Sequence, residues 1–275
     1  MSDQQAKWSG DYQELVQRNV GFITAEQQEK LRSTKVAVFG VGGIGGTAFE
    51  VLVRTGIGKF SISDRDHYDA TNMNRQVFAY RHTIGKLKID VAADWAKQID
   101  TDVEIDKFDH VDEDNIAEIL EGADVAVFGI DSLGPCIIAS RKAREMGIPI
   151  VEGWAIPYGN VRVFTNETPS LEEAYGLPTA GRKVADISED ELKKLNVDLL
   201  LGLGRIEGIP GFYTAETVDK IRSGFIVSFA PTVWLTAVMI ALETVKVILD
   251  WGTIALADPD FTLYDPFKHR IPTVT

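Results

Sequence analysis

The sequence has almost no cysteine: Cys136 is the only one among 275 residues. A single cysteine cannot form a disulfide within the chain, and it excludes the cysteine-based zinc sites, which take their ligands in pairs. The histidines are also few and form no ligand pair; they are His67, His82, His110 and His269. We therefore expect no zinc site and a reducing, cytoplasmic compartment.

Positive charge is scarce as well. The chain has 28 Lys and Arg against 41 Asp and Glu, which gives a net charge of −13 and a pI near 4.8. It also lacks any run of basic residues. A chain with this charge does not bind phosphate backbones or anionic lipid nonspecifically, so we expect neither nucleic acid nor a membrane surface as a partner.

Long hydrophobic runs are missing too. The longest apolar stretch, residues 225–242, is interrupted by polar residues and continues directly into Glu243 and Lys246, which favours a buried helix over a bilayer span. The first ten residues are polar and lack the pattern of a signal peptide. No repeat of 20–50 residues and no Pro/Gly/Ser-rich linker divides the chain, so we expect one domain over residues 1–275.

What the sequence does have is an alternation of short apolar runs with amphipathic segments. The pattern predicts strands at residues 35–39, 59–63, 103–108, 125–130 and 148–152, and helices at residues 48–54, 86–99, 112–122 and 135–146. Near-continuous apolar strands that alternate with helices indicate a mostly parallel sheet covered on both faces. We predict an α/β, Rossmann-like fold.

The flanking segments differ in texture from this alternating core. Residues 1–34 are expected to be a helical arm and residues 35–165 the nucleotide-binding core, whose last strand, 160–165, alternates as if half-exposed. Residues 166–224 form a crossover insert with a capping box that begins at Ser188 and a second helix at 215–222. Its basic residues, Arg182, Lys183 and Arg205, could meet an acidic carrier. Residues 225–275 are expected to add a helix at 232–249 and an antiparallel strand at 261–264.

A glycine-rich loop follows the first strand directly. Gly40, Gly42, Gly43 and Gly45 form a G-x-G-G-x-G pattern that leads into a helix. Glycines in this position let the backbone approach a phosphate, whose charge is met by free N–H groups and the helix dipole. Asp64 ends the next strand, where an acidic side chain can accept hydrogen bonds from ribose hydroxyls. The combination predicts a nucleotide site and, by itself, is compatible with NAD or FAD.

Four further polar residues narrow the choice of nucleotide. Asn72 and Arg75 are three residues apart, so one helical turn would place both on one face, and Lys88 precedes an amphipathic helix. Asp131 follows the strand at 125–130, at the edge where open α/β sheets bind ligands. Cations with a carboxylate suit a nucleoside triphosphate with Mg²⁺ better than a nicotinamide. The alternative for each residue is an exposed charge that caps a helix.

The ordered set of motifs resembles the ThiF/MoeB/HesA family, the adenylyltransferase core of the ubiquitin-activating enzymes. The resemblance rests on the glycine pattern, Asp64, Asn72-x-x-Arg75-Gln76, Lys88 and Asp131 in that order. It extends to Arg18, in the position of an Arg-Gln-Ile-like motif of the family, and to the closing residues 262–265. Apart from residues 166–224 it covers nearly the whole chain.

The resemblance implies attack of a carboxylate on the α-phosphate of ATP, giving an acyl-adenylate and pyrophosphate. The carboxylate would be the C-terminus of a ubiquitin-like or sulfur-carrier protein or of a peptide. The implied roles are ribose binding for Asp64, phosphate binding for Asn72, Arg75 and Lys88, Mg²⁺ binding for Asp131, and, for Arg18, contact with the γ-phosphate of the neighbouring subunit's ATP. A homodimer would therefore be part of the mechanism.

The sequence departs from the family pattern in several places. It lacks both the Cys-x-x-Cys pairs that hold zinc in many members and a cysteine in the crossover insert. Cys136 instead falls in the first turn of a helix, where it is either a small buried residue or a thiol of lowered pKa. We expect the former, hence adenylation without a covalent enzyme intermediate. Ser132 stands where relatives often have Asn, and Trp154 and Tyr158 are either groove-lining or core aromatics.

Three other functions remain open at this point. One is a relative of the tRNA threonylcarbamoyladenosine dehydratases, which also lack the zinc pairs; the negative charge argues against it. Another is an NAD- or FAD-dependent oxidoreductase, which has no use for Asn72, Arg75 and Lys88 as a group. The third is a noncatalytic partner subunit, which the presence of every matched ATP and Mg²⁺ position argues against.

Overall fold

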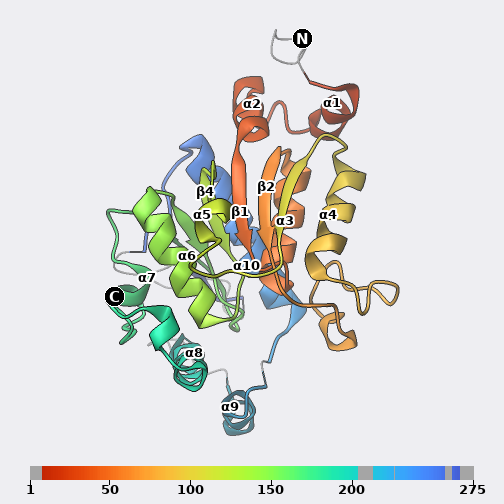
Figure 1. The fold of residues 1–275 in the computed structure, drawn as a ribbon. Coiled ribbons are helices and arrows are strands. Elements are labelled where there is room, and N and C mark those ends of the chain that lie inside the picture. Colours follow the sequence, from red (N-terminus) through yellow and green to blue (C-terminus); the bar gives the residue numbers. More distant parts are fainter. Residues whose placement is uncertain (1–7, 204–212, 226, 258–261, 267–275) are drawn as a thin grey trace.

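A mixed β-sheet forms the centre of the molecule (Figure 1). The computed structural model describes residues 8–203, 213–225, 227–257 and 262–266, and the sheet within these residues has seven strands in the order β3-β2-β1-β4-β5-β6-β7. The strands are β1 (Lys35–Phe39), β2 (Lys59–Ser63), β3 (Glu104–Phe108), β4 (Val125–Phe128), β5 (Ile150–Glu152), β6 (Gly159–Phe164) and β7 (Thr262–Tyr264). Strands β1 to β5 are parallel, whereas β6 and β7 pair antiparallel. The predicted fold class is confirmed, including the antiparallel C-terminal extension.

Helices cover both faces of this sheet (Figure 1). They are α1 (Gly10–Val16), α2 (Ala25–Ser33), α3 (Gly43–Thr55), α4 (Lys88–Ile99), α5 (Ile116–Ile119), α6 (Leu133–Met146), α7 (Leu171–Ala174), α8 (Glu189–Leu203), α9 (Ala215–Arg222) and α10 (Ala230–Leu249), with short 3-10 turns at Ala70–Asn72 (η2) and Val184–Asp186 (η3). Alternate side chains of β1 enter opposite layers: Val36 and Val38 pack with α3, α4 and α10, whereas Ala37 and Phe39 pack with α5 and α6.

One strand and one helix of the sheet region differ from the sequence-based expectation. Strand β6 is buried along its whole length, because it is an interior strand between β5 and β7 and packs against α10; the half-exposed reading was therefore wrong. The helix expected over residues 112–122 reduces to the single turn α5. The Asp112 carboxylate accepts from the backbone N–H groups of Asp114 and Asn115, and this local turn replaces the first half of the helix.

Helix α10 is the apolar segment that the sequence placed in the core. Its length and composition would also allow it to cross a bilayer, but one face of it is buried against α3 and β6. The contact is close at Gly153, where an added Cβ would lie 2.7 Å from the Thr236 side chain and 2.5 Å from the Asn160 carbonyl oxygen. This packing holds the end of β5 and the residues after it in place.

The crossover segment leaves the sheet after β6 and contains α7, η3, α8 and α9. Helix α8 is much longer than the short helix that the capping box predicted, and it packs on α6, with Leu192 beside Gly134. Arg182 is paired within the segment, to Glu191 at 2.5 Å, so it is not a free surface cation. Arg205 lies outside the described residues.

Candidate active site

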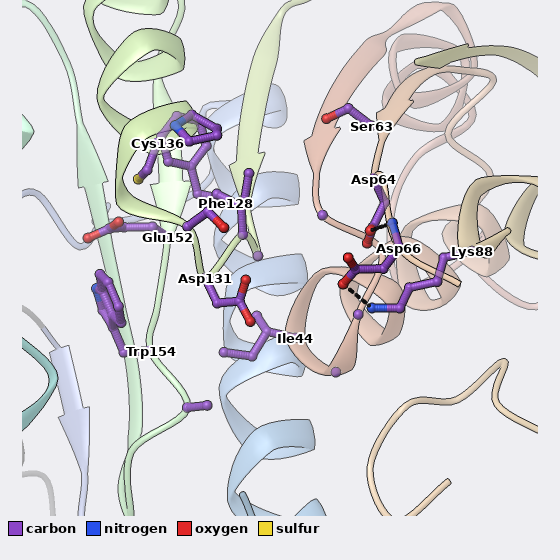
Figure 2. Close-up of a pocket in the computed structure, with 18 of the residues that line it drawn as sticks. Ile44, Ser63, Asp64, Asp66, Lys88, Phe128, Asp131, Cys136, Glu152 and Trp154 are labelled. Carbon is purple, nitrogen blue, oxygen red and sulfur yellow. Dashed lines mark hydrogen bonds and ion pairs between the residues drawn. The ribbon is translucent and has the colours of Figure 1, made fainter. Parts of the chain in front are cut away.

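A cleft opens at the carboxyl ends of β1, β2, β4 and β5, where the strand order changes direction between β1 and β4 (Figure 2). This is the edge at which open α/β sheets bind ligands. The cavity has a volume of about 300 Å³. Figure 2 shows Asp64, Asp66 and Lys88 on one side of the cleft, Glu152 and Trp154 on the other, and Asp131 between them.

The glycine loop forms the floor of the cleft. Gly40, Gly42 and Gly43 line it, whereas Gly45 does not. Gly40 has a φ of +83°, and a Cβ on Gly45 would lie 1.9 Å from the Gly40 carbonyl oxygen, so both glycines allow β1 and α3 to approach closely. Helix α3 begins at an N-cap, Gly42, that has no capping side chain. Its first N–H groups therefore face the cleft as donors for an anion.

Asp64 at the end of β2 ties the glycine loop to the cleft wall. Its two carboxylate oxygens accept from the backbone N–H groups of Val41, at 2.9 Å, and of Asp66, at 3.0 Å. Burial raises the pKa of Asp64, and the positive charge of Lys88 opposes that rise. An oxygen that accepts one backbone hydrogen bond still has capacity for another, so the carboxylate can accept from a ligand hydroxyl.

Lys88 is a buried cation at the first position of α4. Its side chain is only 7% exposed, and its Nζ lies 2.9 Å from Asp66 Oδ2. Asp66 itself is more than half exposed and was not singled out from the sequence. A buried ammonium with one exposed partner keeps two donors for a further anion at the cleft.

Arg75 brings a second cation to the cleft from the turn after η2. Burial lowers the pKa of its guanidinium, and the charge of Asp131 opposes that shift. One guanidinium nitrogen donates to the Thr71 carbonyl at 3.1 Å and to Asn74 Oδ1 at 2.8 Å. Trp234 of α10 holds the backbone of Arg75 in place by donating to its carbonyl at 2.8 Å.

Asn72 and Arg18, by contrast, do not line the cleft. The Asn72 side chain accepts from the backbone N–H of Asp69, within the capping box of η2, at 3.1 Å. Arg18 is exposed in the turn between α1 and α2, at the opposite edge of the sheet from the cleft (Figure 1). Within one chain, therefore, the structure brings together Asp64, Arg75, Lys88 and Asp131 and leaves these two residues outside.

Asp131 is an exposed carboxylate in the loop between β4, which ends at Phe128, and α6. Its backbone carbonyl accepts from Asn196 Nδ2 of α8 at 2.9 Å, while its carboxylate accepts no hydrogen bond within the described residues. Those residues also contain no group of three His, Cys, Asp or Glu side chains able to hold a metal. A single free carboxylate fits Mg²⁺, which takes one or two carboxylates and completes its shell with phosphate oxygens and water.

The side of the cleft formed by β5 and α8 holds residues that the sequence reasoning did not assign. Glu152 ends β5 and is buried; burial raises its pKa to about 7, while Arg162 and Trp154 oppose the rise. Tyr175 donates to Glu152 and accepts from Trp154 Nε1 at 2.6 Å. Glu152 could have been found from the sequence, because it is the last residue of a predicted strand and so lies at the same edge as Asp64 and Asp131.

Two open questions about side chains near β5 are answered by burial. Cys136 lines the cleft but is only 4% exposed, and burial, with the nearby charge of Glu152, raises the pKa of its thiol. Tyr158 belongs to a small buried cluster with Ile156 and Leu263, whereas Trp154 lines the cleft. The thiol is therefore a small buried group, and only Trp154 of the two aromatics is available to a ligand.

The comparison with protein-family models matches residues 16–275 to the ThiF family. The chain belongs to the ThiF family. This ThiF-family chain is 32% identical over 132 residues to the SAMP-activating enzyme E1 of Haloferax volcanii, an alignment that covers 48% of this chain and 49% of that protein. It spans about half the length of several curated relatives that it matches.

Solved structures share the fold at low sequence identity. Escherichia coli tRNA N6-threonylcarbamoyladenosine dehydratase in complex with AMP superposes with a TM-score of 0.62 at 22% identity, over 88% of this chain and 97% of that one. Escherichia coli MccB with ATP superposes with a TM-score of 0.66 at 17% identity, over 99% of this chain and 72% of that one. Both relatives bind adenine nucleotides, as their structures record.

Proposed function

We propose that this protein is an ATP- and Mg²⁺-dependent adenylyltransferase that activates the C-terminal carboxylate of a ubiquitin-like or sulfur-carrier protein or of a peptide. The observation that carries the proposal is the grouping of Arg75, Lys88 and Asp131 around the glycine loop at the N-terminus of α3. Two cations, a carboxylate that accepts no hydrogen bond from the described part of the chain, and a helix N-terminus fit a triphosphate with its metal ion. Membership of the ThiF family supports the same reading.

The residues divide the work of holding the nucleotide. Asp64 binds the ribose, while Arg75, Lys88 and the N–H groups of α3 bind the phosphates. Asp131 holds Mg²⁺, which, when bound, neutralises phosphate charge. The substrate carboxylate forms a bond to the α-phosphorus as the bond to the β-phosphate oxygen breaks, and pyrophosphate leaves. Such a displacement needs positioning and charge neutralisation more than a side-chain nucleophile.

The state of Cys136 supports adenylation without a covalent enzyme intermediate. A buried thiol whose pKa is raised supplies little thiolate, and the thiolate is the nucleophilic form. Asn72 uses its Oδ1 in the η2 capping box, so a phosphate contact would come from its Nδ2, and it requires the nucleotide to extend beyond the residues that line the cleft.

The test is ATP–pyrophosphate exchange in the presence of small proteins ending in Gly-Gly, free amino acids and peptides. Arg75→Ala and Asp131→Asn should each lower exchange by roughly 10²–10³-fold, because each removes charge complementary to the reacting triphosphate. Arg54→Ala, on the exposed side of α3, is the matched control for Arg75 and should retain exchange. Exchange that persists in both cleft variants would contradict the proposal.

The active form is proposed to be a homodimer in which Arg18 of one copy reaches the cleft of the other. Helix α10 exposes Trp234, Val238 and Leu242 at a spacing of four residues, a stripe of 44–54% exposed side chains. Trp234 contacts Arg75 at the cleft, and at the far end of α10 Trp251 packs on Phe22, four residues after Arg18. If two copies of α10 pack antiparallel about a two-fold axis, the end of one copy near Arg18 lies beside the end of the other copy near Arg75.

Complementation between two inactive variants tests the dimer. A subunit with Arg18→Ala keeps an intact cleft but has no Arg18 for the cleft of its partner. A subunit with Arg75→Ala keeps Arg18 but has a defective cleft. Mixed and re-equilibrated subunits should recover up to about a quarter of wild-type exchange, because half of the dimers carry one complete site out of two. Val238→Glu should give monomers by light scattering and lose exchange; an active monomer would contradict this part of the proposal.

A dehydratase acting on tRNA is the second candidate, supported by 36% identity over 118 residues to the tRNA threonylcarbamoyladenosine dehydratase of Escherichia coli, 42% of this chain. The net charge of −13 argues against it. A gel shift with bulk tRNA at moderate salt decides between the two. Equilibrium binding of ATP against NAD separates both from an oxidoreductase.

A further inference from the structure

The turn that carries Arg75 packs against the start of α10. Trp234 Nε1 donates to the Arg75 carbonyl at 2.8 Å. Val233 and Arg75 flank the same glycine of the cleft, because a Cβ added to Gly43 would lie 3.0 Å from Val233 Cγ1 and 3.5 Å from Arg75 Cγ. Helix α10 therefore fixes where the backbone of Arg75 lies relative to the N-terminus of α3.

Asn74 connects the guanidinium of Arg75 to the chain just before α10. Its Nδ2 donates to the Ser228 carbonyl at 3.2 Å, and its Oδ1 accepts from Arg75 Nη1 at 2.8 Å. Both contacts require the same orientation of the amide, since the reverse would oppose two oxygens at Ser228 and two donors at Arg75. Arg75 and Ser228 line the cleft and Asn74 does not, so Asn74 affects a cleft ligand only through the residues that it holds.

One nitrogen makes the contacts of the Arg75 guanidinium with the described part of the chain. Nη1 donates to Asn74 Oδ1 at 2.8 Å and to the Thr71 carbonyl at 3.1 Å, which uses both of its N–H groups. Nε and Nη2 keep their N–H groups for other acceptors, and together they form an edge of the guanidinium that can bind two phosphate oxygens in parallel. Asn74 and Thr71 thus hold one end of the guanidinium and leave this edge to a ligand.

We propose that Asn74 and Trp234 are positioning residues for Arg75, and that they hold its side chain and its backbone in the orientation that binds a triphosphate. The inference rests on the proposed function, in which Arg75 binds the phosphates. An arginine side chain loses rotamer freedom when it binds an anion, and a side chain that is already held loses less. The two residues therefore raise the affinity of the cleft for phosphates without contacting them.

The test is equilibrium binding of ATP and of adenosine to Asn74→Ala and Trp234→Phe. Asn74→Ala removes both contacts of the amide, whereas Trp234→Phe removes the indole donor and keeps an aromatic ring on the exposed stripe of α10. In each variant the affinity for ATP should fall by about three- to tenfold, the size of effect that one hydrogen bond has. The affinity for adenosine, which has no phosphate, and KM for the acceptor peptide should both stay within about twofold of wild type.

A double-mutant cycle with Arg75→Ala separates positioning from a general effect on the fold. Without the guanidinium there is no side chain to orient, so Asn74→Ala or Trp234→Phe should change the affinity for ATP by less than about twofold in the Arg75→Ala background. Light scattering checks that Trp234→Phe has the same oligomeric state as wild type, since Trp234 also belongs to the exposed stripe of α10.

Two matched controls carry the same substitutions outside the cleft. Asn166→Ala changes an exposed asparagine in the turn after β6, and Trp95→Phe changes a partly buried tryptophan of α4. Neither residue lines the cleft, so both variants should bind ATP as wild type does.

Each outcome bears on the inference separately from the proposed function. If Arg75→Ala weakens ATP binding but one of the two variants binds ATP as wild type does, the positioning role of that residue is overturned and the adenylyltransferase stands. Equal losses for ATP and adenosine, or a loss that persists in the Arg75→Ala background, also overturn the role. If Arg75→Ala itself binds ATP and supports exchange as wild type does, Arg75 does not bind the phosphates, and the inference falls with that part of the proposed function.

Discussion

Burial raises the pKa of a carboxylate on each side of the cleft, and the two sides differ in the neighbours that oppose the rise. On the β2 side, formed by Ser63, Asp64, Asp66 and Lys88, Asp64 accepts two backbone hydrogen bonds and lies in the field of Lys88, which itself is paired with Asp66. On the β5 side, formed by Glu152, Trp154, Asn196 and Leu200, burial raises the pKa of Glu152 to about 7 although Arg162 and Trp154 oppose the rise. The difference shows that two backbone N–H groups and a lysine offset the burial of a carboxylate on one side of the cleft, whereas burial dominates on the other.

The largest expected effect comes from breaking the β2 side at its buried cation. Lys88→Met should lower exchange by roughly 10²–10³-fold and weaken ATP binding, because the phosphates lose a charge that acts in a partly desolvated site. The affinity for the acceptor peptide should change little, which initial-rate kinetics with each substrate varied will show.

Lys107→Met is the matched control for that change. Lys107 lies on β3, is 44% exposed and is paired with Asp90 of α4. Its replacement therefore removes the same charge outside the cleft. It should retain exchange within about twofold, as expected for exposed pairs. An equal loss of exchange in Lys88→Met and Lys107→Met would show that Lys88 does not bind the phosphates.

An intermediate effect is expected on the pH dependence of the free energy of unfolding, through Glu152. The folded chain binds the Glu152 proton more tightly than the unfolded chain, with a pKa of about 7 against the ordinary 4.5, so its contribution is complete below pH 4.5 and is lost as the pH rises through 7. The Glu152→Gln variant has no proton to lose at this position, so its stability does not fall with pH for this reason. Relative to wild type its free energy of unfolding should rise by about 3 kcal/mol between pH 4.5 and 8.

Urea unfolding at several pH values measures that difference. Glu145→Gln, at an exposed carboxylate 68% accessible to solvent, should show no comparable change with pH. A flat difference for Glu152→Gln would mean that Glu152 is ionised in the folded chain, and the contrast with the β2 side would then disappear.

The smallest effect concerns the thiol of Cys136, a buried residue that lines the cleft. Because Cys136 is buried and its pKa is raised, a thiol reagent at pH 8 should modify the folded chain at least about tenfold more slowly than the urea-unfolded chain. Fast modification of the folded chain, with loss of exchange, would instead place a reactive thiol on the β5 side.

Local patterns accounted for much of what the sequence predicted. The strand–glycine–helix unit from Lys35 to Thr55 depends on short-range rules, since glycine at positions 40 and 45 is required wherever that turn is made. The prediction that Asp64 and Asp131 lie at one edge follows from parallel strands alone. These inferences needed no knowledge of distant contacts.

Other expectations depended on neighbours that the sequence does not reveal. The pattern of β6 looked half-exposed, but its burial was decided by β7 and α10, which come much later in the chain. Asn72 had the right spacing from Arg75, yet its side chain is used in a cap. Spacing predicts a shared face but not which partner a side chain takes.

The sequence by itself determined the fold class, the glycine loop and the strand-end acids, because each rests on periodicity or on residues close together in the chain. Only the tertiary structure decided that Asn196 reaches Asp131 across 65 residues, that Glu152 loses its water, and that Arg18 lies away from its own cleft. Burial and pairing over such separations are properties of the packed chain, since they depend on which segments exclude water from one another.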